Sequence, residues 1–96
     1  MPFDLPLPVA LRRARWKVKI RDKETREPPH VTIIRGTRAW RINLRTGAFL
    51  DAEPAASEIP VQIVAQIRQQ ETWQQLRAAW DVMYPNNPVF SPEEPE

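Results

Sequence analysis

The chain has 96 residues, no cysteine, eleven prolines and two glycines, and its formal net charge is +2 at pH 7. This length allows a single domain, and the missing cysteines exclude disulfides and thiolate metal sites. The sequence contains no run of about 18 apolar residues and no signal-peptide pattern, which predicts a cytoplasmic protein without a membrane segment.

The charges are sorted along the chain. Residues 12–45 carry twelve Lys or Arg and three acidic residues, whereas residues 46–96 carry two Arg and eight acidic residues. The near-neutral total therefore combines a basic half with an acidic half. A basic half of this kind favours contact with a polyanion or with an acidic partner.

The N-terminal segment, residues 1–11, is rich in proline, and Phe3, Leu5 and Leu7 alternate along it. Proline is tolerated at a sheet edge but not in a central strand. We therefore expect an extended or disordered segment, which could lie along a sheet edge.

An antiparallel meander is expected next. Apolar and basic side chains alternate strictly in the first segment, which is the pattern of a half-buried strand. Gly36 and Gly47 mark two tight turns, and such short connections favour antiparallel pairing, with Phe49 opposite Leu44. The predicted strands are residues 15–21, 31–35, 38–45 and 48–51.

Apolar residues then recur at helical spacing between residues 59 and 84. The step from Ile67 to Trp73 breaks the phase, so the segment predicts either one kinked helix or two short helices that meet near residues 71–72. Ser57 is the expected N-cap. The apolar positions are Val61, Ile63, Val64 and Ile67, followed by Trp73, Leu76, Trp80 and Met83.

The sequence thus predicts an α+β fold. A meander of three or four antiparallel strands (about 15–51) packs on the helical segment (about 59–84), in a single domain of residues 12–84 that is followed by a disordered acidic tail, 85–96. The tryptophans fall at core positions and are expected to fill the space between sheet and helix, with a base-stacking platform as the alternative. They are Trp16, Trp40, Trp73 and Trp80.

Basic side chains line the predicted solvent face of the sheet. Alternate residues of a strand are about 6.6–7 Å apart, so a row of cations can neutralise several backbone phosphates of RNA or DNA without reading bases. A solvated sheet face whose charges discourage edge aggregation fits the same pattern. The two rows are Arg15, Lys17, Lys19 and Arg21 on the first strand, and Arg41 and Arg45 on the third.

His30 is the only histidine and the only candidate catalytic residue. It follows two prolines at a strand start and, by alternation, shares the face of the cations, where it could serve as a general acid or base. The structural alternative is a histidine that holds the loop through a backbone hydrogen bond. One histidine without cysteine does not supply a zinc ligand set, so we expect neither a metal site nor a cofactor.

Several short motifs occur in an ordered series over residues 16–84: Pro28-Pro29-His30, Gly36, Leu44-Arg45-Thr46-Gly47, and Leu76 followed by Trp80. The series resembles a family of short bacterial proteins of unknown function with a Pro-Pro-His-x-His signature, although the second histidine is Thr32 here. Members of that family often lie beside another short reading frame and are suspected toxin–antitoxin components. The resemblance therefore implies a cognate small partner protein.

Two functions from different classes follow. The first is a small non-enzymatic binding module whose basic sheet face binds a partner protein, a nucleic-acid backbone or both, as a toxin–antitoxin-like component. The alternative is a metal-independent ribonuclease toxin that uses His30 with neighbouring Arg or Lys. RNA cleavage without a metal usually needs a second proton-transfer group, and Thr32 does not provide one, so the sequence favours the binding module.

Overall fold

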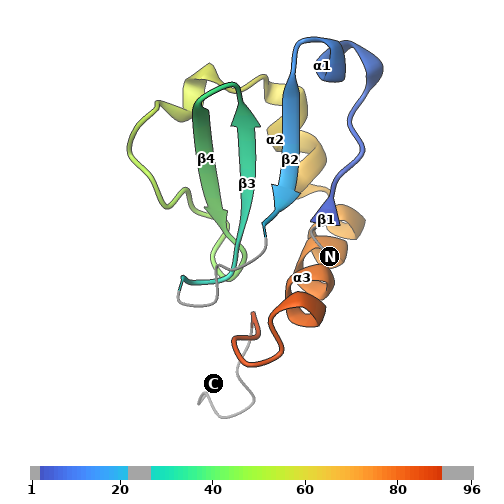
Figure 1. Cartoon of the computed structure of the whole chain (residues 1–96), viewed down its shortest axis with the longest axis vertical. Coiled ribbons are helices and arrows are strands. Elements are labelled where there is room, and N and C mark those ends of the chain that lie inside the picture. The colour runs from blue at the N-terminus through green and yellow to red at the C-terminus, as the bar shows by residue number, and fades with distance from the viewer. Residues whose placement is uncertain (1–2, 22–26, 90–96) are drawn as a thin grey trace.

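The computed structural model describes residues 3–21 and 27–89, and it confirms the α+β fold. Four antiparallel strands form one sheet in chain order: β1 (Phe3–Asp4), β2 (Trp16–Ile20), β3 (His30–Arg35) and β4 (Arg38–Asn43). The helices are α1 (Val9–Arg13), α2 (Val61–Arg68) and α3 (Gln70–Met83), with a short 3-10 helix, η1 (Ala56–Glu58). Helices α2 and α3 cover one face of the sheet (Figure 1).

The β3–β4 hairpin closes in a two-residue turn at Gly36 and Thr37, as the sequence predicted. Gly36 has a φ of 61°, a conformation that glycine adopts without steric cost. The turn places Arg35 directly opposite Arg38, and the pairing of β2 with β3 places Trp16 opposite Arg35 on the other side. Three side chains from three strands therefore form one row across this end of the sheet.

Strand β4 ends two residues earlier than expected because of a side-chain-stabilised turn. The Asn43 side-chain oxygen accepts hydrogen bonds from the backbone N–H of Arg45 (2.7 Å) and Thr46 (3.3 Å). An Asn side chain that bonds the backbone two residues later stabilises a turn instead of an extended strand. Arg45, which we expected on the strand, consequently lies in the turn that follows it.

The expected fourth strand of the meander, residues 48–51, is reduced to an isolated bridge. Phe49 pairs with Ile42 and not with Leu44, because the early turn shifts the register. Flanking backbone hydrogen bonds of 2.8 Å keep the segment beside β4. The edge strand β1 brings the number of strands in the sheet to four.

Residues 3–11 are part of the folded domain, in line with the expected sheet edge, although the expected domain began at residue 12. Strand β1 pairs with the end of β2, and the Leu5 N–H donates to the Val18 carbonyl (2.8 Å). Leu5 and Leu7 are each only 7% exposed. Pro8 then takes the N-cap position of α1, a five-residue helix that was not predicted.

The C-terminal helical segment consists of two helices, which was one of the two expectations. Gln69 has an extended backbone (φ −61°, ψ 138°) and separates α2 from α3, slightly before the expected junction at residues 71–72. The expected N-cap was wrong: Pro60 occupies that position in α2, and Ser57 lies in η1. An extended residue breaks the helical phase, which explains the shift in the apolar pattern.

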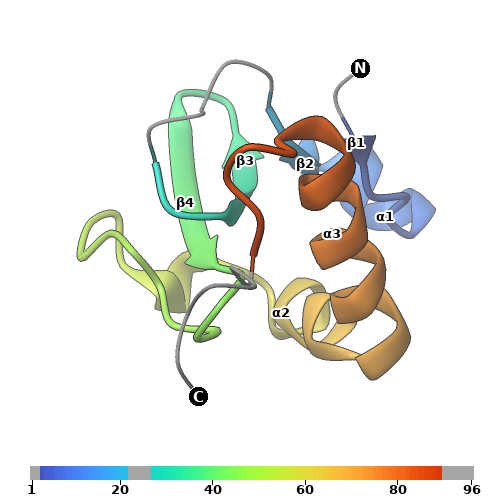
Figure 2. The ribbon, with the colours of Figure 1, turned by 90° about the horizontal axis from the view of Figure 1, so that it is seen from below.

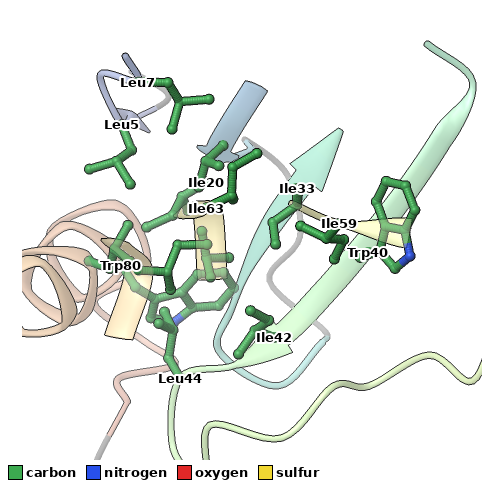
Figure 3. Packing of buried hydrophobic residues seen from close by; sticks show 14 of the residues in the cluster. Leu5, Leu7, Ile20, Ile33, Trp40, Ile42, Leu44, Ile59, Ile63 and Trp80 are labelled. Carbon is green, nitrogen blue, oxygen red and sulfur yellow. The ribbon is translucent and has the colours of Figure 1, made fainter. Parts of the chain in front are cut away.

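One apolar core fills the space between the sheet and the two helices (Figure 3). Trp40 and Trp80 are 1% and 0% exposed, which confirms their expected place in this core. The Trp16 ring is also buried and lies 5.6 Å from the Trp40 ring, whereas Trp73 is only partly buried. Val61 was expected on the apolar side of the helix but is exposed, so the buried positions of α2 begin at Ile63.

The chain after α3 folds back across the end of the sheet that Figure 2 shows from below. We call residues 84–89 the clasp, because they bind two segments that are distant in sequence. The Tyr84 hydroxyl donates to the Arg21 carbonyl, and the Asn87 side-chain amide donates to the Glu27 carbonyl (2.8 Å). The clasp therefore holds the chain at the end of β2 and again just before β3.

The clasp overlaps with the tail that was expected to be disordered. Val89 is 1% exposed, and its N–H donates to the Asp81 carboxylate (2.8 Å). Residues 85–89 are thus packed on the domain, because backbone and side-chain hydrogen bonds fix a segment whose composition reads as disordered. The remainder of the expected tail, residues 90–96, lies outside the described residues.

Replacing Trp40 or Trp80 by Ala should lower the free energy of unfolding by roughly 3–5 kcal/mol, because each change removes a large buried side chain and leaves a cavity. Urea denaturation followed by circular dichroism would measure the loss. Trp73→Ala is the control and should cost clearly less, since its side chain is only partly buried. Equal stability of all three variants would contradict the assigned core.

Candidate functional site

The predicted row of cations on the sheet face does not form one continuous surface. Arg41 is the clearest exception. Its Nε and Nη2 donate to the two carboxylate oxygens of Asp51 at 2.9 and 2.7 Å, and its Nη1 pairs with the Glu27 carboxylate. A guanidinium that two carboxylates bind in this way is neutralised. Arg41 consequently joins the segments before and after the hairpin and is not available to a ligand.

Electrostatics at this ion pair reinforce the geometry. The hydrogen bonds from Arg41 lower the pKa of Asp51 below its usual range, and coulombic attraction to Arg41 adds to the effect while partial burial opposes it. The hydrogen bond to Asp51 in turn raises the pKa of Arg41. Both side chains therefore stay ionised, and the pair is a stabilising contact of the fold.

Two further predicted cations also have partners within the fold. The Arg45 guanidinium donates to the carbonyls of Pro88 (Nη2, 2.9 Å) and Val89, so it anchors the clasp. The Lys19 ammonium lies 3.8 Å from the Asp4 carboxylate, across the β1–β2 pair. The outward-facing part of the sheet therefore carries less free positive charge than alternation alone suggests.

The other three predicted cations are exposed, but they do not lie together. Lys17 points outward from β2. Arg15 precedes the strand in the turn after α1, and Arg21 follows it at the far end. At about 3.3 Å per residue, Arg15 and Arg21 are roughly 20 Å apart. Lys17 lines a surface hollow together with Lys19. Near the start of β2, Arg15 and Lys17 are the two predicted cations that pair with no described carboxylate.

Four cations that the sequence analysis did not single out join these two residues. They gather where β2 begins and where β3 turns into β4, at the end of the sheet opposite to the clasp (Figure 1). We call this region the basic end, and it comprises Arg12, Arg13, Arg15, Lys17, Arg35 and Arg38. Arg38 pairs with Glu58, whereas the other five form no ion pair with a residue in 3–21 or 27–89.

Cations of the basic end line two surface hollows. One, of about 450 Å³, runs between residues 4–7 and β2, and its polar lining includes Asp4, Arg12, Lys17 and Lys19. The other, of about 320 Å³, lies at the β3–β4 turn, where Arg15, Arg35, Gly36, Thr37 and Arg38 line it beside Ala14. Both hollows are open to solvent and lined by several cations, as expected of a surface that meets anions.

A signal for the missed cations was present in the sequence. A two-residue turn at Gly36 and Thr37 necessarily places Arg35 and Arg38 opposite each other. Arg12 and Arg13 were missed for another reason, since the five-residue helix α1 is too short for its pattern to be recognised. The turn was predicted, so the pair of arginines beside it could have been predicted too.

His30 is placed as a structural residue. Its side chain is 1% exposed, and its ring lies 5.4 Å from the Trp80 ring. The Nδ1 atom hydrogen-bonds the Pro28 carbonyl (2.9 Å), which is the backbone contact of the structural alternative. Thr32, two residues on, is buried as well, at 2% exposure. The sequence analysis expected His30 on the solvent face with the cations, whereas its imidazole is buried in the structure.

The residues on which the family resemblance depends lie in turns or contact other parts of the fold. Pro29 accepts a hydrogen bond from the Leu44 N–H (2.8 Å), and His30 packs against Trp80. Gly47, like Gly36, has a positive φ, 79°. These residues connect the start of β3, the turn after β4 and helix α3. The resemblance therefore concerns residues that determine a fold, and the partner protein that it implies stays a prediction.

No protein-family model, curated protein or solved structure matches this chain. Within residues 3–21 and 27–89, the structure has no helix long and apolar enough to cross a membrane. Over the same residues, no three His, Cys, Asp or Glu side chains group closely enough to hold a metal ion.

The Arg41–Asp51 pair predicts a defined pH dependence. Because the pKa of Asp51 is lower in the folded than in the unfolded protein, its ionisation stabilises the fold above an unfolded pKa of about 4. This stabilisation is lost as the pH falls from about 4 through the folded pKa. Asp51→Asn should lower stability at pH 7 and flatten the acid branch of the curve. Urea denaturation between about pH 7 and pH 2.5 would measure both effects, and parallel curves for variant and wild type would contradict the assignment.

Proposed function

We propose that this protein is a non-enzymatic binding module whose basic end contacts the phosphate backbone of a nucleic acid. The observation that carries the proposal is the separation of paired from unpaired cations. Arg41 and Arg45 at the clasped end are consumed by contacts within the fold. At the basic end, five exposed or part-exposed cations have no described carboxylate partner. Arg35 contacts the Trp16 ring and the Ala14 carbonyl, but none of the five cations is neutralised by a described carboxylate.

The arrangement of the cations suits a backbone better than base edges. They come from a helix end, a strand and a hairpin, and they surround two shallow hollows rather than a protruding element that could enter a groove. Phosphate contacts of this kind position a protein without reading sequence. Trp16 and Trp40 are buried, and so they offer no base-stacking surface at this end. We therefore expect binding without marked sequence preference.

The resemblance to the family of short bacterial proteins adds a second element to the proposal. We expect a cognate small partner protein in the cytoplasm, with this chain as one component of a toxin–antitoxin-like pair. Co-expression with the product of the adjacent short reading frame, followed by size-exclusion chromatography, would show whether a complex forms.

Binding to labelled RNA and DNA oligonucleotides should be strongly salt-dependent. The expected log–log slope is about −0.7 to −0.9 per phosphate contacted. Replacing Arg12 and Lys17 together by Ala should reduce the slope by about two units, since each removes one phosphate contact. Fluorescence anisotropy over a range of salt concentrations would give both the affinity and the slope.

The matched control removes the same number of cations elsewhere. Arg21 lies beyond the far end of β2, and Arg68 is exposed on α2, where it donates to the Gly47 carbonyl (3.0 Å). The double variant R21A/R68A should keep the wild-type slope. Equal slopes in the two double variants, or no binding of the wild type at low salt, would reject the basic end as the site. Degradation of the RNA during the assay would instead favour the ribonuclease.

A further inference from the structure

The hollow at the β3–β4 turn is built differently from the rest of the basic end. Its cations are three arginines, Arg15, Arg35 and Arg38, and they surround the turn residues Gly36 and Thr37. Arg35 and Arg38 are cross-strand partners, directly opposite each other in the ladder. Like charges in this position repel each other and destabilise a hairpin. An anion bound between them would convert this repulsion into two attractions.

The Arg35 guanidinium is held in place before any ligand arrives. It lies over the Trp16 ring, 5.4 Å from the ring centroid, and its Nε donates to the Ala14 carbonyl (3.2 Å). The Trp16 ring in turn packs 5.6 Å from Trp40 in the core. A stacked and hydrogen-bonded guanidinium loses little further freedom when it binds. The contact with the Ala14 carbonyl uses Nε, and within residues 3–21 and 27–89 the two terminal amino groups of Arg35 donate to no other residue.

Arg38 is fixed from the other side. Its Nη1 pairs with the Glu58 carboxylate of the 3-10 helix η1. The Arg38 side chain is 58% exposed. Glu58 lines a second hollow, which also borders Arg38 but is separate from the hollow at the β3–β4 turn. The carboxylate thus orients the guanidinium and also competes with any anion for it.

Arg15 has an unusual backbone for its side chain. It is the single non-glycine residue with a positive φ in the described part of the chain, at 71°. It follows the last turn of α1, where its N–H donates to the Arg12 carbonyl (3.0 Å), and this is a position that glycine commonly fills. Glycine would avoid the steric cost of this conformation. Arginine at this position carries that steric cost but supplies a third cation to the lining of the hollow.

We propose that this hollow binds one phosphate group, with Arg35 and Arg38 on opposite sides of it and Arg15 as the third cation. The proposal rests on the proposed function and deepens it, since it assigns a single phosphate to a specific subsite. Arginine suits the role because its planar fork donates two parallel hydrogen bonds to phosphate oxygens. The phosphate can belong to a nucleic-acid strand or be free inorganic phosphate.

Titration of the protein with inorganic phosphate, followed by NMR of the arginine side-chain Nε–H groups, would test the subsite. We expect saturable shifts at Arg35, Arg38 and Arg15, while chloride at the same ionic strength produces none. Arg35→Lys keeps the charge but removes the fork and should weaken phosphate binding about tenfold. The matched control Arg21→Lys should bind phosphate like the wild type.

Two more variants test the subsite with substitutions that are expected to leave the protein folded. Glu58→Gln removes the competing carboxylate and should tighten phosphate binding. Arg15→Gly relieves the backbone conformation, so it should keep or raise the melting temperature while it weakens phosphate binding. Unchanged phosphate affinity in R35K, E58Q and R15G together would overturn the proposal, as would shifts spread evenly over all arginines.

Oligonucleotides distinguish the source of the phosphate. If a 5′-phosphorylated oligonucleotide binds more tightly than its 5′-hydroxyl form, and R35K abolishes the difference, the subsite takes a terminal phosphate. If the two forms bind equally and inorganic phosphate competes with both, it takes a backbone phosphate. If neither oligonucleotide binds but inorganic phosphate does, the subsite stands and the nucleic-acid function fails. If oligonucleotides bind with salt dependence but inorganic phosphate shifts no specific arginine, the nucleic-acid function stands and the phosphate subsite fails.

Discussion

The indole N–H of Trp80 is buried with the rest of the side chain, and therefore it needs an acceptor inside the protein. The acceptor is the Asn87 carbonyl, 2.7 Å away, in the chain that follows helix α3. The same ring packs against His30 at the start of β3 and lies 4.1 Å from the Tyr84 ring. Burial of this one residue thus requires the chain to return across the sheet, and the contacts of the clasp follow from it. Trp40 acts similarly at the other side of the core, because its N–H donates to the Ala55 carbonyl (3.1 Å) and fixes the segment before α2.

These contacts make the two ends of the sheet chemically different. At the clasped end, charged groups are satisfied within the fold: Arg41 by Asp51 and Glu27, and Arg45 by backbone carbonyls. At the basic end, cations stand around two hollows with few carboxylates beside them. This difference arises within the basic half of the sequence, because Arg41 and Arg45 belong to that half and are nevertheless paired at the clasped end. The α1–β2 turn and the β3–β4 turn lie at the same end of the sheet, and this brings the cations of the basic end together (Figure 1).

Local patterns in the sequence predicted the parts of the fold that depend on local rules. Alternation located β2 and the buried phase of β4, and the broken helical phase allowed for two helices. The parts that failed depend on contacts between distant residues. The partners of Arg41 lie 10 and 14 residues away, so alternation counted it as an exposed cation. Most hydrogen bonds of the clasp are accepted by backbone carbonyls. Every residue has a carbonyl group, so these contacts leave no signal in the amino-acid composition, and the composition alone predicted disorder. The turn at Asn43 is local, but it depends on the orientation of the Asn43 side-chain amide, which the sequence does not reveal. This turn places Arg45 outside the strand.

The order in which the chain is synthesised gives the clasp a further consequence. Tyr84 and Asn87 bind segments that leave the ribosome about 60 residues earlier, which corresponds to several seconds at ordinary rates of translation. The hairpins of the meander have short connections and can form during this interval. The core around Trp80 cannot close until the clasp emerges, because its hydrogen-bond acceptor and the buried Val89 follow helix α3 in the sequence. The domain therefore closes only after residue 89 has been made, and a product terminated before it exposes apolar surface that chaperones and proteases recognise.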